Sequence, residues 1–381
     1  MGETMVPSTR SEKLGHADWG LLFIVLALLI VGLVMVYSAS YGFALSKGGP
    51  FEGRPTYFVK RQLVFALIGM VALFVFSRVD YHLYSRYALW ILGGTILVLL
   101  PMLVIKGGAA TASRWLFGSS VQPAELARLG ATVYIAIWLS AKGENIRKIS
   151  LGLVPFALLL GFIAGLIVLQ PNFSTAVLLV ATATAMFFAA GAEMKQLLIG
   201  FLFGGLALVL VALAAPYRSE RVNIWLQSPF ADASGKGFQV VQSLVALNKG
   251  RWFGVGLGQS QQKFNVFAPH TDSLFAIIGE ELGFLGTLLI IALYVFWTWR
   301  GLRIARRASD TYGLLLAVGL VSWVTFQAAL HIAVATASTP PTGTVLPFLS
   351  YGGSSLVSCL ISVGILLNIS RHRPAQEEEL P

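Results

Sequence analysis

Ten segments of this chain are long and apolar enough to cross a lipid bilayer, since a membrane-spanning helix needs about 20 mostly apolar residues. Of the 381 residues, 56% are hydrophobic and 12% are charged, and the mean hydropathy is +0.76. A soluble domain carries about twice that charged fraction. The composition therefore excludes a soluble enzyme, a disordered protein and a nucleic-acid-binding domain, and it predicts an all-α polytopic membrane protein. The predicted spans are residues 19–41, 60–77, 86–105, 124–141, 151–169, 174–191, 196–215, 273–298, 312–337 and 348–369.

The net charge of +10 indicates how these spans are oriented. Short cytoplasmic loops of membrane proteins are enriched in Lys and Arg. If both termini are cytoplasmic, most of the Lys and Arg residues in short connections lie inside. We therefore expect residues 1–17 to form a disordered cytoplasmic N-terminus, residues 18–371 the membrane domain, and residues 372–381 a cytoplasmic tail.

The connection between the seventh and eighth predicted spans, residues 216–272, is far longer than a usual loop and faces outside in this topology. Long ordered loops are often functional. Its run Gly254-Val-Gly-Leu-Gly258 resembles a phosphate-binding loop. Because that run follows no strand of a βαβ unit, its glycines are better explained by tight turns.

Residues 338–355 contain three Pro residues and a Gly-Gly pair, so they do not fit a regular lipid-facing helix. Irregular backbone at membrane depth is tolerated only where it packs in protein or lines a wet cavity. We therefore expect this segment to bound a polar cavity near the outer face, close to the long loop.

Ionisable side chains inside membrane spans are costly and mark candidate functional positions. Glu125 and Arg128 are three residues apart on one predicted helix face, so they either line a site or form a structural ion pair. Glu280 and Glu281 are adjacent and point to different sides, and we expect at least one to make an internal hydrogen bond. His331 fits a buried polar contact better than a ligand or a proton relay.

Two further residues limit the chemistry. Asp272 stands at the external mouth of the eighth span, where it is either a functional carboxylate or only a helix N-cap. The single cysteine, Cys359, excludes an intrachain disulfide and a metal site built from several cysteines.

Several runs of residues together resemble one family, the SEDS proteins (shape, elongation, division and sporulation). The chain resembles this family over nearly its whole length, in motif order and in the ten-span layout, and two runs, at 236–239 and 270–272, look closer to its division branch than to its elongation branch. The runs are Ser113-Arg-Trp-Leu116, Gln122-Pro-Ala-Glu125, Lys236-Gly-Phe-Gln-Val-Val-Gln-Ser-Leu244, Gly254–Gly258, His270-Thr-Asp-Ser-Leu-Phe-Ala-Ile-Ile-Gly-Glu-Glu-Leu-Gly283, Pro341-Thr-Gly343 and Leu346-Pro-Phe-Leu-Ser-Tyr-Gly-Gly-Ser-Ser355.

The resemblance implies a peptidoglycan glycosyltransferase that polymerises lipid II at the outer face of the bacterial cytoplasmic membrane, in cell division or shape maintenance. It also implies a class B penicillin-binding protein as the crosslinking partner. Asp272 matches the family's essential external aspartate, and Trp115 matches a tryptophan that the family needs for activity. Glu125 and Arg128 match a carboxylate and a basic position of the central cavity, where Lys is commoner.

The chain departs from the family pattern at three positions. The family's Gln-Pro-Asp-Leu-Gly-Thr motif reads Gln170-Pro-Asn-Phe-Ser-Thr175, so Asn172 replaces the Asp and Ser174 replaces the Gly. His331 stands where the family usually has Asn. These changes bear on a second external carboxylate and not on Asp272, and we expect an active but divergent member.

The implied reaction joins the 4-hydroxyl of one lipid-linked disaccharide to the anomeric carbon of another, and undecaprenyl pyrophosphate leaves. It needs a base for the hydroxyl proton and positive charge for the leaving group. We assign the first need to Asp272, which acts directly or by holding a divalent cation, Mg²⁺ or Mn²⁺. The other substrate-binding candidates are Arg61, Trp115, Glu125, Arg128, Lys236, Gln239, Gln242, Ser243, Lys263 and Ser350.

Two other functions stay open at this point: a lipid II flippase or transporter, and a non-catalytic scaffold of the division machinery. A flippase needs polar groups along its whole path, whereas the polar residues here gather toward the outer side. The expected partners are lipid II, the class B penicillin-binding protein, other division or elongation proteins and membrane lipid, with no nucleic acid; one expected location is the septum. We also expect a lipid-tail groove between spans, and a partner surface at the outer ends of spans eight and nine.

Overall fold

The computed structural model describes residues 15–45, 53–104, 122–170, 172–214, 216–232, 237–266 and 268–372, and within these ranges all regular secondary structure is helical. The helices are α1 (Trp19–Leu45), α2 (Tyr57–Arg78), α3 (His82–Arg86), α4 (Ala88–Val104), α5 (Pro123–Ser140), α6 (Val154–Leu169), α7 (Phe173–Ala189), α8 (Met194–Leu213), α9 (Pro216–Leu226), α10 (Phe238–Gly250), α11 (Leu274–Arg306), α12 (Thr311–Ala335) and α13 (Gly353–Arg371). Short helical turns are η2 (Gly143–Arg147), η3 (Ile149–Leu153), η4 (Pro229–Asp232) and η5 (Gln262–Phe264).

Each of the ten predicted spans coincides with a helix of this structure. Among the described residues, seven helices are long and apolar enough to cross a membrane: α1, α2, η3 joined to α6, α8, α11, α12 and α13. Two shorter apolar helices lie at Ala88–Leu100 and Phe173–Ala189. The chain is therefore a multi-pass membrane protein, while the count of ten spans and the side of each terminus stay predictions.

The two ends of the described chain lie together. The amide of Gly15 donates to the carbonyl oxygen of Arg371 at 2.8 Å, and Asp18 forms an ion pair with Arg300 at 2.9 Å. This contact agrees with an even number of spans, which puts both ends on the same side of the membrane. Residues 1–14 and 373–381 lie outside the described residues, so the predicted disorder of both tails stays a prediction.

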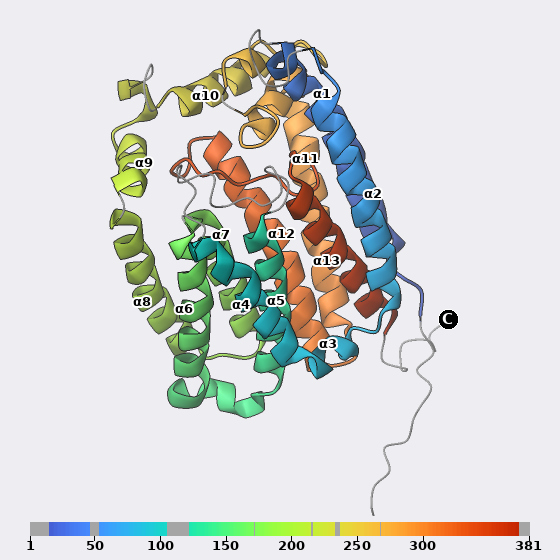
Figure 1. Cartoon of the computed structure of the whole chain (residues 1–381), viewed down its shortest axis with the longest axis vertical. Coiled ribbons are helices and arrows are strands. Elements are labelled where there is room, and N and C mark those ends of the chain that lie inside the picture. Colours follow the sequence, from blue (N-terminus) through green and yellow to red (C-terminus); the bar gives the residue numbers. More distant parts are fainter. Residues whose placement is uncertain are drawn as a thin grey trace, which may run out of the picture.

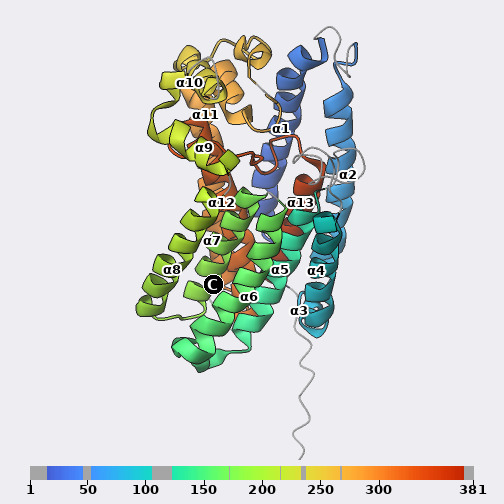
Figure 2. The same cartoon turned by 60° about the vertical axis from the view of Figure 1, so that its left-hand side comes forward.

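Helices α5, α11, α12 and α13 form the centre of the bundle, and α12 also packs against α7. The indoles of Trp297 in α11 and Trp323 in α12 are fully buried there. Helix α2 packs along α13 and α1 along α11, on one side of the bundle (Figures 1 and 2). On the opposite side α8 is peripheral, and Phe201 on it is 82% exposed, as a lipid-facing side chain would be.

The long predicted loop contains helices that the sequence did not predict. Figure 1 shows α9 and α10 running from the end of α8 across one end of the bundle to the start of α11. Helix α10 packs on α11. The loop therefore covers the end of the bundle at which α11 begins.

Helix α11 is interrupted at Gly283, whose φ of 69° and ψ of −168° are not helical. The loop after α10 enters this break with its backbone: the amide of Phe284 donates to the carbonyl of Arg251 at 2.7 Å, and the amide of Val255 to that of Glu280 at 2.9 Å. A Cβ at Gly254 would stand 2.1 Å from the carbonyl oxygen of Glu281. This close approach requires glycine.

The prediction of tight turns in the glycine run is also confirmed. Gly254, Gly256 and Gly258 have φ values of 79°, 102° and 79°, which L side chains rarely adopt.

The last predicted span begins later than expected. Residues 338–352 contain no helix, and α13 begins at Gly353 rather than at residue 348. Prolines and the Gly-Gly pair prevent regular helical hydrogen bonding there. The irregular segment expected for residues 338–355 is thus confirmed up to the start of α13.

Candidate functional site

Asp272 is half-buried at the beginning of α11, in the turn that joins this helix to the long loop. The N-cap residue of α11 is Ser273, and α11 has no side-chain cap hydrogen bond. The N-cap position of α11 is therefore taken by Ser273 and not by Asp272. Its carboxylate faces Gly343 instead, where an added Cβ would stand 3.3 Å from Oδ2 of Asp272.

The irregular segment 338–352, here called the outer segment, is bound to the turn that carries Asp272. The hydroxyl of Ser350 donates to the carbonyl oxygen of Thr271 at 2.8 Å and accepts from the amide of Leu346 at 2.9 Å. The amide of Tyr351 donates to the carbonyl oxygen of His270 at 2.9 Å. Ser350 thus lies beside the turn that carries Asp272.

Helix α2 closes the other side of this turn. The ring of Phe58 lies 4.2 Å from that of His270. Burial lowers the pKa of His270 to about 4, so this imidazole is neutral at pH 7. The amide side chain of Gln62 donates to the carbonyl oxygen of Ser350 at 3.1 Å and accepts from the amide of Gly352 at 3.2 Å. Sequence reasoning missed Gln62, because no spacing signals a contact with a segment so distant in the chain.

Arg61 lies one helical turn beyond Tyr57 on α2 and donates to its hydroxyl at 2.9 Å. It also contacts the hydroxyl of Tyr351, whose pKa is raised by burial and lowered less strongly by the Arg61 charge. Tyr351 in turn is bonded to His270 through its backbone. Arg61 therefore belongs to the same cluster as Asp272.

Helix α10 brings a second group of candidates to the site. The side chain of Gln239 donates to the hydroxyl of Ser273, next to Asp272, at 3.4 Å. Ser243 is buried and donates to the carbonyl oxygen of Gln239 at 2.9 Å. Gln242 is half-buried on the same helix. Of these three, Gln239 is the residue that reaches the turn of Asp272.

The predicted pair of Glu125 and Arg128 is confirmed and is fully inside the bundle. Nη2 of Arg128 donates to the Glu125 carboxylate and, at 2.6 Å, to Oε1 of Gln327. The Arg128 guanidinium carbon lies 4.3 Å from the centre of the Trp323 ring. Nε and Nη1 of Arg128 have no hydrogen-bond partner among the described residues, so this buried cation keeps unused donors.

Lys263 belongs to a different buried cluster, which lies against the end of the glycine run at Gly258. Its ammonium donates to the carbonyl oxygen of Gly258 at 2.6 Å and lies 3.7 Å from Glu281. Glu281 also accepts from the hydroxyl of Ser38 at 2.6 Å, and Glu280 accepts from backbone amides of the same loop. Both glutamates therefore make internal hydrogen bonds, as expected for at least one.

The remaining candidates divide into two groups. Trp115 and Lys236 lie outside the described residues. Asn172 is buried before α7, makes no side-chain cap, and its Nδ2 has no partner among the described residues; Ser174 follows it on α7. An aspartate buried at position 172 would need a partner for its charge, whereas the amide of Asn172 is neutral.

At a divalent-cation site, Asp272 would supply a single carboxylate. Among the described residues, no group of three or more His, Cys, Asp or Glu side chains could hold a metal ion. This donor set does not fit a divalent cation bound by protein alone. The divalent cation expected at Asp272 stays a prediction.

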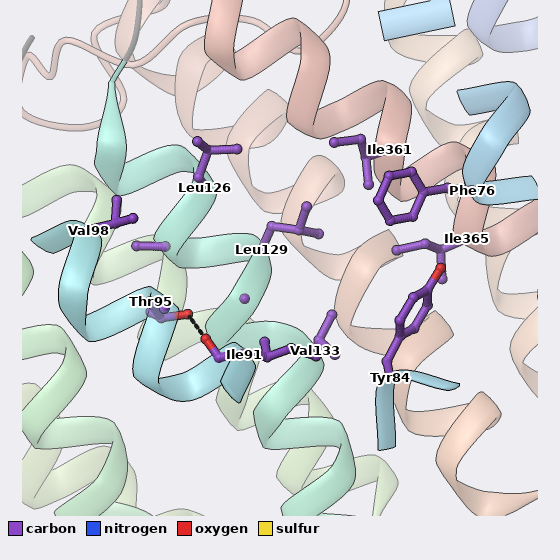
Figure 3. A pocket seen from close by; sticks show the side chains of 13 residues that line it. Phe76, Tyr84, Ile91, Thr95, Val98, Leu126, Leu129, Val133, Ile361 and Ile365 are labelled. Carbon is purple, nitrogen blue, oxygen red and sulfur yellow. Dashed lines mark hydrogen bonds between the residues drawn. The ribbon is translucent and has the colours of Figure 1, made fainter. Parts of the chain in front are cut away.

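A separate groove lies between helices that do not carry Asp272. It has a volume of about 370 Å³ and is lined almost entirely by apolar side chains of α2, α3, α4, α5 and α13 (Figure 3). In Figure 3, Leu126, Leu129 and Val133 of α5 face Phe76, Ile361 and Ile365 across it. The sequence predicts such a groove without locating it.

Comparison with known proteins now identifies the family. The family described as cell cycle protein, with FtsW, RodA and SpoVE as its members, matches residues 19–375. This chain belongs to that family. Stage V sporulation protein E of Bacillus subtilis (strain 168) is 43% identical over 368 residues, which cover 95% of this chain and 99% of the relative. The probable peptidoglycan glycosyltransferase FtsW of Trichlorobacter lovleyi is 39% identical over 363 residues, which cover 94% of each chain.

Solved structures of the FtsW/RodA/SpoVE family share the fold. A chain from a peptidoglycan synthase complex that coordinates polymerization and crosslinking has a TM-score of 0.75 at 29% identity, with 93% of this chain and 98% of that chain covered. A mutant form of the Rod shape determining protein RodA of Thermus thermophilus has a TM-score of 0.68 at 25% identity, covering 94% and 98%. The resemblance inferred from the motifs, including its FtsW-like character, is confirmed.

Proposed function

We propose that this protein is a peptidoglycan glycosyltransferase that polymerises lipid II at the outer face of the cytoplasmic membrane. The observation that carries the proposal is the position of Asp272. It is a half-buried carboxylate at the start of α11, and Ser350, Arg61 and Gln239 gather around its turn. The names of the FtsW relatives and the peptidoglycan synthase complex of similar fold support the same activity.

In this proposal Asp272 is the general base. It takes the proton of the acceptor's 4-hydroxyl as that oxygen bonds to the anomeric carbon of the donor, and the bond to undecaprenyl pyrophosphate breaks. A positioned base typically contributes about 10²–10⁴-fold to such a step. His270 is neutral at pH 7, so it adds no positive charge that would make Asp272 a weaker base.

Among the cations, Arg61 is best placed to stabilise the departing pyrophosphate. It contacts Tyr351, which is bonded to the turn before Asp272. The ammonium of Lys263 is instead held by Gly258 and Glu281, and Arg128 is held by Glu125 and Gln327 inside the bundle. A guanidinium also presents paired donors that match phosphate oxygens.

The apolar groove of Figure 3 is our candidate for the lipid tail. Its lining carries almost no polar surface, so an isoprenoid chain there would stay in a hydrocarbon environment. Helix α5 forms one wall of the groove and also carries the Glu125–Arg128 pair. The same helix would therefore meet both the tail and the polar part of the substrate.

The outer part of α11 is our candidate surface for a class B penicillin-binding protein. Phe284, Leu285 and Leu288 are exposed there, and the ring of Trp252 in the glycine-rich loop lies 5.3 Å from that of Phe284. In the predicted topology Arg300 lies at the inner boundary of the hydrocarbon core. A rise of about 1.5 Å per residue would then bring α11 close to the outer boundary of a core about 30 Å thick at Gly283. A partner with one membrane helix would meet α11 in the bilayer and this loop above it.

The test is lipid II polymerisation by the purified protein, with and without the crosslinking partner, for the wild type and for Asp272→Asn. Glycan chains from the wild type alone support both the enzyme and the base. Chains from both proteins would retain the enzyme and overturn the role of Asp272. No chains from either, with the partner and Mg²⁺ or Mn²⁺ present, would overturn the enzyme and favour a flippase or a scaffold of the division machinery.

A further inference from the structure

Two side chains of α12 hold consecutive carbonyl groups of the outer segment. Nδ1 of His331 donates to the carbonyl oxygen of Thr344 at 2.7 Å, and Nε2 of Gln327 donates to that of Val345 at 2.9 Å. Gln327 and His331 are four residues apart, so they lie one above the other on the same face of the helix. Both are 1% exposed.

The backbone they hold is the part of the outer segment that meets Asp272. Gly343, immediately before Thr344, is the residue against which the Asp272 carboxylate rests. On its other side the segment is bonded to Thr271 through Ser350. The outer segment therefore lies between α12 and the turn of Asp272, and it touches both.

No helix or sheet fixes the outer segment between residues 338 and 352. Its position at Gly343 must come from side chains that bind its backbone. A buried donor that loses its acceptor costs about 1–3 kcal/mol, so the bonds from Gln327 and His331 resist displacement of Thr344 and Val345. The bonds also connect inward, because Oε1 of Gln327 accepts from Arg128 and from the indole of Trp323.

We propose that His331 and Gln327 are positioning residues for Asp272. They fix residues 343–345, and these residues in turn limit where the Asp272 carboxylate can lie. The inference deepens the proposed function and rests on it, because it assigns a role to the environment of the proposed base. An asparagine at position 331 could make the same bond, because an amide N–H, like the Nδ1–H of His331, can donate to the carbonyl oxygen of Thr344.

The experiment compares His331→Leu, Gln327→Glu and His331→Asn with the wild type, using the full-length protein and lipid II. His331→Leu removes the donor to Thr344. Gln327→Glu removes the donor to Val345 and keeps an acceptor for Arg128 and Trp323. Since a displacement of about 1 Å can cost on the order of 10²-fold in rate, we expect kcat to fall about tenfold or more while KM stays within about twofold. His331→Asn keeps a donor and should recover most of the lost kcat.

Thr325→Val is the matched control. Thr325 lies on the same helix and bonds Thr298 of α11 at 2.8 Å, away from the outer segment. Its loss removes a half-buried hydrogen bond of α12 without touching residues 343–345. We expect unchanged kcat for this variant, with a lower melting temperature than the wild type.

Two results would overturn the inference: full kcat in His331→Leu and Gln327→Glu, or a loss of kcat in His331→Leu that His331→Asn does not recover. If His331→Leu does not fold, Gln327→Glu decides, because it loses only the donor to Val345. The Asp272→Asn variant separates this failure from that of the proposed function. An active Asp272→Asn protein overturns the base itself, whereas an inactive one beside a fully active His331→Leu overturns only the positioning role.

Discussion

The carboxylate of Asp272 rests against the backbone of Gly343, with Oδ2 3.3 Å from the place that a Cβ on Gly343 would occupy. Gly343 does not have a left-handed φ, so alanine fits its backbone. We expect Gly343→Ala to push the carboxylate aside and to lower the polymerisation rate by about tenfold, with little change in melting temperature. Gly352→Ala is the control, because its Cβ would have only ordinary contacts from 3.5 Å. Equal rates for the two variants would contradict this relationship.

Two positions of the glycine run have the same φ and differ in the space around them. Gly254 and Gly258 both have φ of 79°, but a Cβ at Gly254 would stand 2.1 Å from the carbonyl of Glu281, whereas Gly258 has nothing within 4 Å. We expect Gly258→Ala to cost only the left-handed strain, about 1–2 kcal/mol. Gly254→Ala should cost several times more, because it expels the loop from the break in α11. Thermal unfolding of the two variants in detergent measures the difference, and similar melting temperatures would exclude the steric explanation.

The buried Glu281 should be needed for stability. It accepts from Ser38 of α1 and from the amide of Gly258, and it faces the buried Lys263. Removing one partner of a buried ion pair costs about 3–5 kcal/mol. We therefore expect Glu281→Ala to lower the melting temperature strongly.

Two variants accompany this experiment. Ser38→Ala removes one hydrogen bond and should cost about 1 kcal/mol. Glu144→Ala changes an exposed glutamate and should cost nothing measurable. A Glu281→Ala protein as stable as Glu144→Ala would show that the cluster does not hold α1 and the loop to α11.

The pKa of about 4 for the buried His270 predicts a pH dependence of stability. An unfolded histidine has a pKa near 6.5. Between about pH 6.5 and pH 4 the unfolded chain therefore binds a proton at His270 that the folded chain does not bind. The stabilising free energy present above about pH 6.5 is lost as the pH falls toward about 4.

The variant His270→Phe keeps an aromatic ring against Phe58 and cannot titrate. Its melting temperature should fall less than that of the wild type between pH 7 and pH 5. Parallel curves for the two proteins would show that His270 does not contribute to the pH dependence.

Local features of the sequence determined the helices. Ten apolar stretches predicted helices where the structure has them, because backbone hydrogen bonds within a helix join residues four apart and apolar side chains need no polar partner in the bilayer. The same local reasoning paired Glu125 with Arg128, since residues three apart share a helix face. The start of an apolar stretch placed Asp272 near the beginning of α11, and the Pro and Gly residues predicted the irregular segment before α13.

Tertiary structure alone decided what surrounds Asp272. Ser350 reaches Thr271 across 79 residues, and Gln62 reaches Ser350 across 288. The break of α11 at Gly283 exists because another backbone enters it, and the positioning contacts of Gln327 and His331 depend on how α12 meets the outer segment. Spacing along the chain carries no information about such contacts, because they are fixed by the packing of helices that are distant in sequence.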